Sequence, residues 1–279
     1  MELKCAWKEL LSILPQGLRP EVDKQGRNTL QEIRLRQGKP VVLICSDGRH
    51  QLPSNAKPED LRFVIHAASQ YSPWTATTLP QGYLTASGGH RIGLCGQALL
   101  RKGEMDGFGM FTSMNIRVAR DFAGISSNLW LREKGILILG PPGSGKTTLL
   151  RDLIRQRSQR ENISVVDERG EIFPPSADFD TGPNTDVLTG CSKEDGVTLV
   201  LRAMNPSCIA VDEITAQTDC EALLRAGWCG VSLLATAHAA DLADLRSRPV
   251  YKPLASSGLF ETAVILRRDK SWYTERICT

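Results

Sequence analysis

The stretch GPPGSGKT, residues 140–147, constrains the fold of this chain more than any other feature. It matches the pattern G-x-x-x-x-G-K-[ST] in full, and it stands between an apolar run, GILILG, and a helix-forming run. Its glycines allow the backbone to turn tightly and to point N–H groups inward, which forms a nest for anions. A helix that begins near Lys146 adds the positive end of its dipole. The stretch therefore predicts a phosphate-binding loop between a strand and a helix.

The residue types in this loop predict how a nucleotide is bound. The Lys146 ammonium reaches the β- and γ-phosphates, and the Thr147 hydroxyl is a ligand for Mg²⁺. The loop thus predicts binding of a nucleotide together with Mg²⁺. The predicted nucleotide-binding residues are Gly140, Pro141, Pro142, Gly143, Ser144, Gly145, Lys146, Thr147 and Thr148.

From residue 135 onward, apolar strands alternate with helices. Strands are expected at ISVVDE, SCIAVDEI and VSLLATAHA, and helices at TTLLRDLIRQRSQR, EDGVTLVLRAMNP and TDCEALLRAGWCG. Near-continuous apolar strands that alternate with helices indicate a mainly parallel sheet with helices on both faces. The tail, from TAVILRR to WYTERIC, predicts a final hairpin. The predicted fold class is α/β.

The first 120 residues follow a different pattern and predict a small α+β domain. The expected elements are a helix in the first fifteen residues, strand–turn–strand over 32–52, a helix over 58–71, two short strands over 82–100 joined at Gly88-Gly89, a loop over 101–111 and a strand over 112–120. We therefore expect an N-terminal domain at 1–120, a linker at 121–134 and a second domain at 135–279.

Two strands end in adjacent acidic residues, Asp167-Glu168 and Asp212-Glu213. A phosphate loop needs an acid on a neighbouring strand to hold Mg²⁺. In a parallel sheet both strand ends open on the edge that carries the phosphate loop, so geometry permits both pairs. We assign Asp212 to the magnesium shell and Glu213 to activation of the attacking water, because this pair follows the cleaner apolar run.

A third strand end carries Thr236 and His238, in LLATAHA. A histidine at this edge could sense the γ-phosphate. The alternative is a buried, hydrogen-bonded histidine with a structural role.

Composition narrows the classes of partner. The formal net charge is +3 and the chain has no dense Lys/Arg run, so no nucleic acid is expected. Eight cysteines occur without a C-x-x-C pair, which gives little support to a zinc site and favours reduced thiols in the cytoplasm. No signal peptide is recognised, and no apolar run approaches the roughly 20 residues that span a bilayer. A membrane role would need a protein partner or docking at the surface.

Four stretches in order, GPPGSGKTTLLRDL, VVDERGEI, LRAMNPSCIAVDEI and LLATAHAADL, resemble the phosphate loop, aspartate box, Walker B segment and histidine box of secretion ATPases. Those are hexameric RecA-like motors of type II and type IV secretion and of pilus machines. The sequence is more similar to one branch, the stage III sporulation protein AA family, through GYLTASGGHRIGLCG, TSMNIRVAR and RPVYKPLASSGLFETAVILRR. The resemblance covers roughly residues 28–268.

The resemblance implies ATP as the nucleotide and a role for each acidic pair. Asp167 and Glu168 would help to hold Mg²⁺ and the lytic water, and arginines of the N-terminal domain would approach the nucleotide across the ring. Arg91 and Arg117 lie in the matching strands, and Arg120 is a weaker candidate. The implied catalytic residues are Glu213, Glu168, His238, Arg91 and Arg117, and the implied metal ligands are Thr147, Asp212 and Asp167.

The sequence departs from the family after Glu213. The family continues Walker B as E-I-G-R, whereas this chain has EITA, residues 213–216. The missing arginine puts in doubt any coupling contact made from that position, and Arg225 is a neighbouring replacement.

The resemblance implies Mg²⁺-dependent ATP hydrolysis by a hexameric motor. The motor would dock on a membrane protein partner at the cytoplasmic face and energise a channel-like complex between mother cell and forespore. Three alternatives stay open: a nucleotide-gated assembly scaffold with little turnover, a P-loop kinase or small-molecule NTPase, and a nucleic-acid motor.

Overall fold

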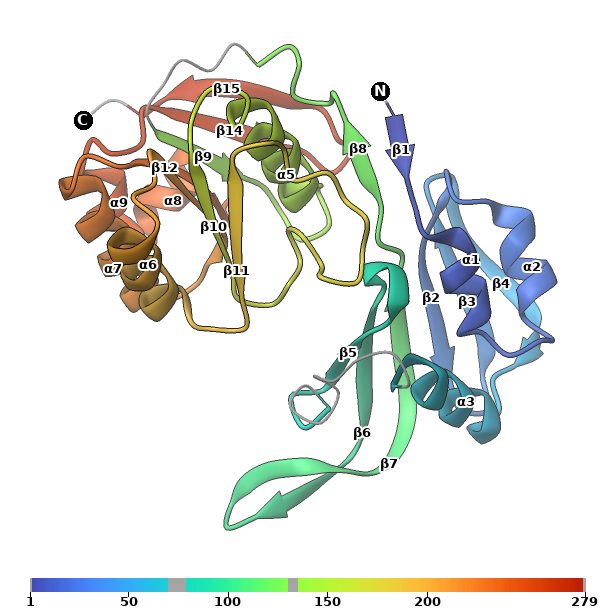
Figure 1. Ribbon diagram of the computed structural model, residues 1–279. Coiled ribbons are helices and arrows are strands. Elements are labelled where there is room, and N and C mark those ends of the chain that lie inside the picture. Colours follow the sequence, from blue (N-terminus) through green and yellow to red (C-terminus); the bar gives the residue numbers. More distant parts are fainter. Residues whose placement is uncertain (1, 70–78, 130–134, 278–279) are drawn as a thin grey trace. The chain divides into compact units, whose positions relative to one another are not determined.

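The computed structural model describes residues 2–69, 79–129 and 135–277 (Figure 1). Contacts divide the chain into two compact units. The N-terminal unit contains Leu3–Asp121 and Pro174–Asp178, and the C-terminal unit contains Met1–Glu2, Phe122–Phe173 and Phe179–Thr279. The boundary between the two units passes through two short strands, β1 (Glu2–Lys4) and β8 (Asp121–Ala123). Residues 130–134 of the expected linker lie outside the described residues.

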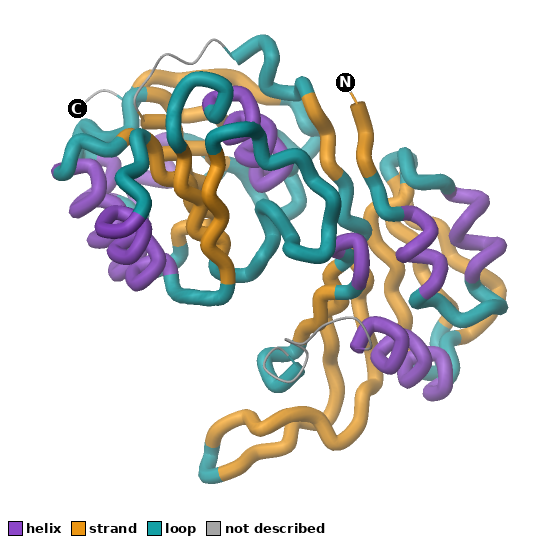
Figure 2. Tube along the Cα trace, in the orientation of Figure 1, coloured by secondary structure: helices purple, strands orange, loops and turns teal. Residues whose placement is uncertain are grey.

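A seven-stranded sheet forms the centre of the C-terminal unit within the described ranges (Figure 2). Its order is β11-β10-β12-β13-β9-β14-β15, and every neighbouring pair is parallel except β14–β15. The strands are β9 (Gly135–Leu139), β10 (Ile163–Asp167), β11 (Thr185–Thr189), β12 (Cys208–Ile214), β13 (Ser232–Ala237), β14 (Thr262–Leu266) and β15 (Trp272–Arg276).

Helices cover both faces of this sheet. Strand residues alternate between two cores: Ile136 and Ile138 pack with Leu150 of α5 (Lys146–Arg157), whereas Leu137 and Leu139 join the opposite core. The helices of the opposite core are α6 (Lys193–Ala203), α7 (Gln217–Trp228), α8 (Leu242–Ser247) and α9 (Lys252–Ala255). This arrangement confirms the predicted α/β class with a mainly parallel sheet and a final antiparallel hairpin.

The N-terminal unit contains an antiparallel sheet of order β4-β3-β2-β7-β6-β5 in the described part of the chain. The strands are β2 (Leu30–Arg36), β3 (Pro40–Cys45), β4 (Gly48–Asn55), β5 (Tyr83–Thr85), β6 (Arg91–Arg101) and β7 (Glu104–Arg117), with a 3₁₀ turn η1 (Ser87–Gly89). The helices α1 (Trp7–Ser12), α2 (Arg19–Gln25) and α3 (Pro58–Ser69) pack apolar side chains on one face of the sheet, which forms a third core.

Several boundaries differ from the sequence expectation. The first fifteen residues hold strand β1 before helix α1, rather than one helix. The loop expected over 101–111 is wrong, because β6 and β7 pair along a long hairpin in which Leu100 lies opposite Met105. Three register shifts interrupt this pairing, and its glycines hide the alternation that would have marked it as a strand. Strand β11 and helices α8 and α9 were not expected, and residues 70–71 of the helix expected over 58–71 lie outside the described residues.

Among the residues that the structure describes, no helix is both long and apolar enough to cross a lipid bilayer.

Candidate nucleotide-binding site

The phosphate-loop stretch connects β9 to α5 and depends on its glycines. Gly140, Gly143 and Gly145 have φ values of 156°, 72° and 102°, a range that residues other than glycine rarely adopt. At Gly140 an added Cβ would also lie 2.8 Å from the backbone oxygen of Leu266. The stretch is therefore folded into the tight strand-to-helix turn that the sequence predicts, with the N-terminus of α5 at its end.

Lys146, the first residue of α5, is buried at the base of the loop. Its Nζ donates to the backbone oxygens of Gly140 (2.9 Å) and Pro141 (3.1 Å). Burial lowers the pKa of Lys146, and the negative charges of Asp212 and Glu213 offset this in part. Ser144 Oγ, also buried, has no hydrogen-bond partner among the described residues. The loop thus offers a cation and a buried hydroxyl to an anionic ligand.

A chain of hydrogen bonds runs from Lys146 through His238 to Glu213. Lys146 Nζ donates to His238 Nδ1 at 3.0 Å, so Nδ1 is the acceptor and the imidazole carries its proton on Nε2. His238 Nε2 then donates to Glu213 Oε1. The structure therefore brings together three residues that the sequence had assigned to one site from three different elements.

An oxygen cluster lies beside this chain. Thr147 Oγ1 donates to Asp212 Oδ2 at 2.6 Å, and Thr236 Oγ1 donates to Asp212 Oδ1. The backbone N–H of Glu213 in turn donates to Thr236 Oγ1 at 2.8 Å. A hydroxyl and a carboxylate in direct contact form the kind of donor set that Mg²⁺ takes at nucleotide sites, so the residues present fit this ion.

Strand β12 bulges where Asp212 and Glu213 lie. Its register against β13 shifts between Val211 and Ile214, and Glu213 has a φ of 54°. A bulge changes the direction of a side chain at the end of a strand, and a residue held at positive φ costs about 1–3 kcal/mol. Just after the bulge, the Tyr251 hydroxyl donates to the Ile214 backbone oxygen at 2.9 Å. The surrounding structure thus holds the Glu213 carboxylate toward His238.

Opposing effects set the protonation of Glu213. Burial raises the pKa of its carboxyl, but the hydrogen bond from His238, together with the charges of Arg169 and Lys146, lowers the pKa below its usual value overall. Glu213 is therefore ionised at neutral pH and is able to accept a proton.

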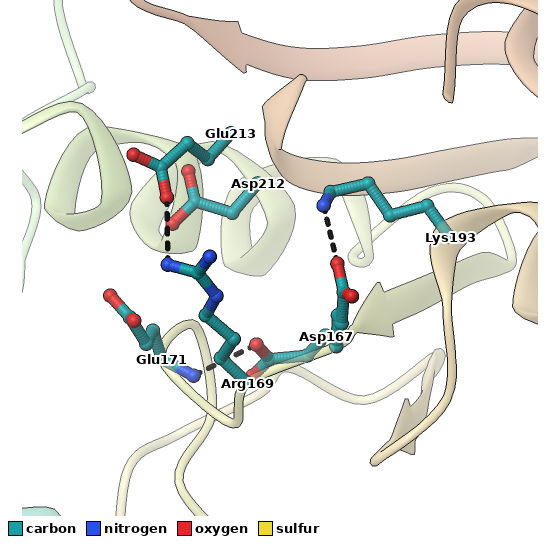
Figure 3. Close-up of a pocket in the computed structure, with 7 residues that line it drawn as sticks. Asp167, Arg169, Glu171, Lys193, Asp212 and Glu213 are labelled. Atoms are coloured by element: carbon teal, nitrogen blue, oxygen red, sulfur yellow. Dashed lines mark hydrogen bonds and ion pairs between the residues drawn. The ribbon is translucent and has the colours of Figure 1, made fainter. Parts of the chain in front are cut away.

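Asp167 ends β10 and holds the loop that follows it (Figure 3). Its Oδ1 accepts from the N–H of Glu171 (2.8 Å), and its Oδ2 accepts from the N–H of Ile172 and Phe173 (2.9 Å each). The side chain is buried, and the negative charge of Asp212 is among the causes that raise its pKa. In this structure Asp167 therefore fixes the loop conformation, and its role as a metal ligand stays a prediction.

Asp167 is expected to titrate well above an ordinary aspartate. Burial, together with the charge of Asp212, raises its pKa to about 6, although the amides of Phe173 and Ile172 oppose the rise. The carbon-13 resonance of its side-chain carboxyl, assigned by comparison with Asp167→Asn in Mg²⁺-free buffer, should show a midpoint near pH 6. A midpoint near pH 4 would contradict the burial seen here. Exposed Asp186 serves as the internal control.

Two basic residues at this site were missed from the sequence. Arg169 Nη1 lies 3.3 Å from Glu213 Oε2 (Figure 3). Lys193, at the start of α6, donates to Glu168 Oε2 at 2.6 Å. Each cation thus pairs with one of the two predicted catalytic glutamates. They line a pocket with Asp167, Glu168, Glu171, Asp212 and Glu213. Arg169 directly follows the first acidic pair, which was the available signal, whereas Lys193 has no signal in its local sequence.

The segment EITA, residues 213–216, in which the sequence departs from the family, is part of the N-terminal cap of α7 (Gln217–Trp228). Asp219 Oδ2 accepts from the N–H groups of Thr215 (2.9 Å) and Ala216 (3.1 Å) at the start of α7. Arg225 forms an ion pair with Glu194 at 3.6 Å. The structure therefore gives Arg225 a partner outside the acidic cluster.

The two predicted arginines lie on neighbouring strands of the N-terminal unit. Arg91 of β6 lies directly opposite Arg117 of β7. The Arg91 guanidinium lies 4.5 Å from the centre of the Tyr83 ring, and Arg117 Nε lies 3.9 Å from Glu32 Oε1. The Arg117 side chain is 61% exposed. Their roles toward a nucleotide stay predictions.

Comparison with known proteins places the chain among related sequences and folds. The family model "Sporulation stage III, protein AA" matches residues 6–275. Stage III sporulation protein AA of Bacillus subtilis (strain 168) is 36% identical over 94% of this chain and 91% of its own length. Among solved structures, the Legionella pneumophila ATPase DotB matches with a TM-score of 0.57 at 17% identity, over 94% of this chain and 80% of that one. The pilus retraction motor PilT with bound ADP matches with a TM-score of 0.59 at 17% identity, over 88% and 76%. The fold is that of a RecA-like P-loop NTPase.

Proposed function

The chain belongs to the stage III sporulation protein AA family, and on this premise we propose that it is a Mg²⁺-dependent ATPase of the secretion type. The observation that carries the proposal is the contact between Thr147 and Asp212, 2.6 Å, with ionised Glu213 beside it. A phosphate loop, an Mg²⁺ donor pair and a proton acceptor at one sheet edge are the parts that nucleotide hydrolysis needs.

The residues of the site divide the work of hydrolysis among them. On binding, Lys146 exchanges the backbone oxygens of Gly140 and Pro141 for phosphate oxygens, since it cannot serve both. Thr147 and Asp212 would hold Mg²⁺, which when bound neutralises charge on the phosphates. Glu213 accepts the proton of the attacking water, and His238, which contacts both Lys146 and Glu213, orients the carboxylate.

Arg169 pairs with Glu213, and Lys193 pairs with Glu168, in this structure. The positive charge of Arg169 beside Glu213 Oε2 makes this carboxylate a weaker proton acceptor. We expect the guanidinium to turn to the negative charge of the phosphates when nucleotide binds, which frees Glu213.

The proposed assembly is a hexameric ring in which Arg91 and Arg117 of one subunit approach the nucleotide of the next. Two like charges directly opposite each other on paired strands are destabilising, and an anion between them removes this cost. Glu32, 3.9 Å from Arg117, neutralises its charge only in part, so positive charge remains to attract such an anion. Residues 1–120 would form the N-terminal domain, 121–134 a linker and 135–279 the ATPase domain.

The proposed setting is the cytoplasmic face of a membrane, to which the ring docks through a membrane protein partner. The name of the Bacillus subtilis relative, stage III sporulation protein AA, supports a role in sporulation. Hydrolysis would energise a channel-like complex between mother cell and forespore.

The rate of ATP hydrolysis against protein concentration tests the proposed function. We expect specific activity to rise cooperatively with concentration, as required for sites shared between subunits. In Lys146→Ala, ATP affinity should fall about 10- to 100-fold, because a hydrogen bond to a charged group contributes about 1.5–3 kcal/mol. Calorimetric titration with ATP and Mg²⁺ measures this loss.

Lys252→Ala, which removes an exposed lysine of α9, is the matched control and should bind ATP normally. Specific activity that is flat with concentration would contradict the shared site. Normal ATP binding without turnover would instead support the nucleotide-gated scaffold.

A further inference from the structure

The turn between β3 and β4 brings three metal-ligating side chains together, far along the chain from the phosphate loop. Cys45 ends β3, Asp47 lies in the turn and His50 lies on β4. Cys45 is paired with Gly48, and Leu43 with His50. Because Cys45 and Leu43 are two residues apart on one strand, Cys45 and His50 project from the same face of the hairpin. The pairing therefore puts a thiol and an imidazole on one side, next to the turn carboxylate.

The ligand atoms are close enough to share one ion. One ligand atom from each of Cys45, Asp47 and His50 lies within 4.8 Å of the other two, and His50 Nε2 lies 3.0 Å from Asp47 Oδ1. In the described part of the chain, this is the one group of three such side chains with this geometry. Small rotations of two exposed or half-buried side chains, Asp47 and His50, would close the group around a metal ion.

We propose that Cys45, Asp47 and His50 form a binding site for a borderline divalent transition-metal ion, with Zn²⁺ as the representative. Thiolate, imidazole and carboxylate are the three ligand types that Zn²⁺ takes in proteins, whereas Mg²⁺ prefers oxygen ligands alone. The site lies in the N-terminal unit and is distinct from the nucleotide site in the C-terminal unit. Three protein ligands leave the fourth tetrahedral position to a water molecule or an added ligand.

The surroundings supply both charge and support. The hydrogen bond from His50 is the main cause of the lowered pKa of Asp47, so this carboxylate is ionised. Burial raises the pKa of the Cys45 thiol, and Asp47 adds to this, while Arg120 opposes it. A metal ion replaces the thiol proton and so removes the cost of the buried charge. Cys45 Sγ also donates to Gln25 Oε1 at 3.6 Å, and this amide can turn its NH₂ group toward a bound thiolate.

The site would fasten the β3–β4 turn to the end of α2, where Gln25 lies. Metal binding to the folded chain stabilises that chain against unfolding, so the thermal transition of the N-terminal unit should move upward when the ion is added.

Titration of the metal-free full-length protein with Co²⁺ tests the proposal. Co²⁺ substitutes for Zn²⁺ and reports its ligands: a thiolate ligand gives a charge-transfer band in the near ultraviolet, which an all-oxygen nucleotide site does not give. We expect this band to saturate at one Co²⁺ per chain and to disappear when Zn²⁺ is added. His50→Gln and Asp47→Asn should each weaken Co²⁺ binding about tenfold or more, and Cys45→Ser should abolish the band.

Two matched variants control for incidental binding. Cys95→Ser removes an exposed thiol of β6, and His66→Gln removes an exposed imidazole of α3. Both should bind Co²⁺ as the unmodified protein does. A wild-type titration without a thiolate band would overturn the site, as would unchanged affinity in His50→Gln. His50 is only half-buried, so its variant decides the question even if Cys45→Ser fails to fold.

Discussion

Replacing Glu213 with glutamine should lower the rate of ATP hydrolysis by roughly 10²- to 10⁴-fold, the contribution typical of a positioned general base. The amide cannot accept the proton of the attacking water. It still accepts the hydrogen bond that His238 donates, so the bulge at the end of β12 should remain in place. ATP binding should therefore be retained, because Lys146 and the phosphate loop are untouched. Turnover by phosphate release and affinity by calorimetry separate the two effects.

Glu261→Gln is the matched control, since Glu261 is an exposed glutamate of the same unit. Its turnover should equal that of the unmodified protein. Substantial hydrolysis by Glu213→Gln would move the role of base to Glu168, which Lys193 holds in the same pocket.

Mixing Glu213→Gln with Arg117→Gln extends this experiment to the proposed ring. Each variant alone is expected to be slow. In a mixed ring, some interfaces combine the intact Glu213 of one subunit with the intact Arg117 of its neighbour, so part of the activity should return. No recovery on mixing would mean that Arg117 acts elsewhere.

Asp152→Ala should lower the free energy of unfolding by about 3 kcal/mol, because it removes one partner of a buried ion pair. Asp152 of α5 is 1% exposed and accepts hydrogen bonds from the N–H groups of Gly124 (2.9 Å) and Ser126 (2.8 Å). It also accepts from Ser126 Oγ at 2.6 Å and from Arg155 Nη1 at 2.7 Å. These donors lose their acceptor in the variant. Urea unfolding followed by circular dichroism measures the loss at pH 7.

The loss of stability in Asp152→Ala should also depend on pH. Burial raises the pKa of Asp152, but the hydrogen bonds from Ser126 and Gly124 and the charge of Arg155 lower it below the model-peptide value of 3.8. A folded-state pKa below the unfolded value stabilises the fold above pH 3.8, and this contribution is lost as the pH falls through the folded-state pKa. The difference between Asp152→Ala and the unmodified protein should therefore shrink below about pH 4. Asp186→Ala, at an exposed position of β11, should change stability by no more than about 0.5 kcal/mol.

Local rules explain why the sequence predicted much of the C-terminal unit. The phosphate-loop pattern depends on glycine conformation over a few residues, and strands β9, β10, β12 and β13 are apolar enough to be recognised one at a time. Chain order then brings Thr147, Asp212, Glu213 and His238 to one edge of the sheet.

The features that the sequence did not predict depend on contacts between residues far apart in the chain. Lys193 pairs with Glu168 across a separation of 25 residues, and nothing near Lys193 indicates that it faces an acidic cluster. The three backbone amides that bind Asp167 exist only once its loop has folded, so a strand-end acid looks like a metal ligand in sequence alone. Strand β11 has three exposed or half-exposed polar residues among five and is recognised only through its pairing with β10.

The short segment Pro174–Asp178 makes the two units inseparable by a single cut in the chain. It follows the loop that Asp167 holds, yet it belongs to the N-terminal unit, where Ser176 accepts from the N–H of Gly88 (3.0 Å) through its backbone oxygen and donates to the Ala86 backbone oxygen (3.1 Å) through its hydroxyl. A fragment ending at residue 121 would lack this segment. The carboxylate at the end of β10 thus holds a loop of the C-terminal unit, and the residues that follow this loop in the chain belong to the N-terminal unit.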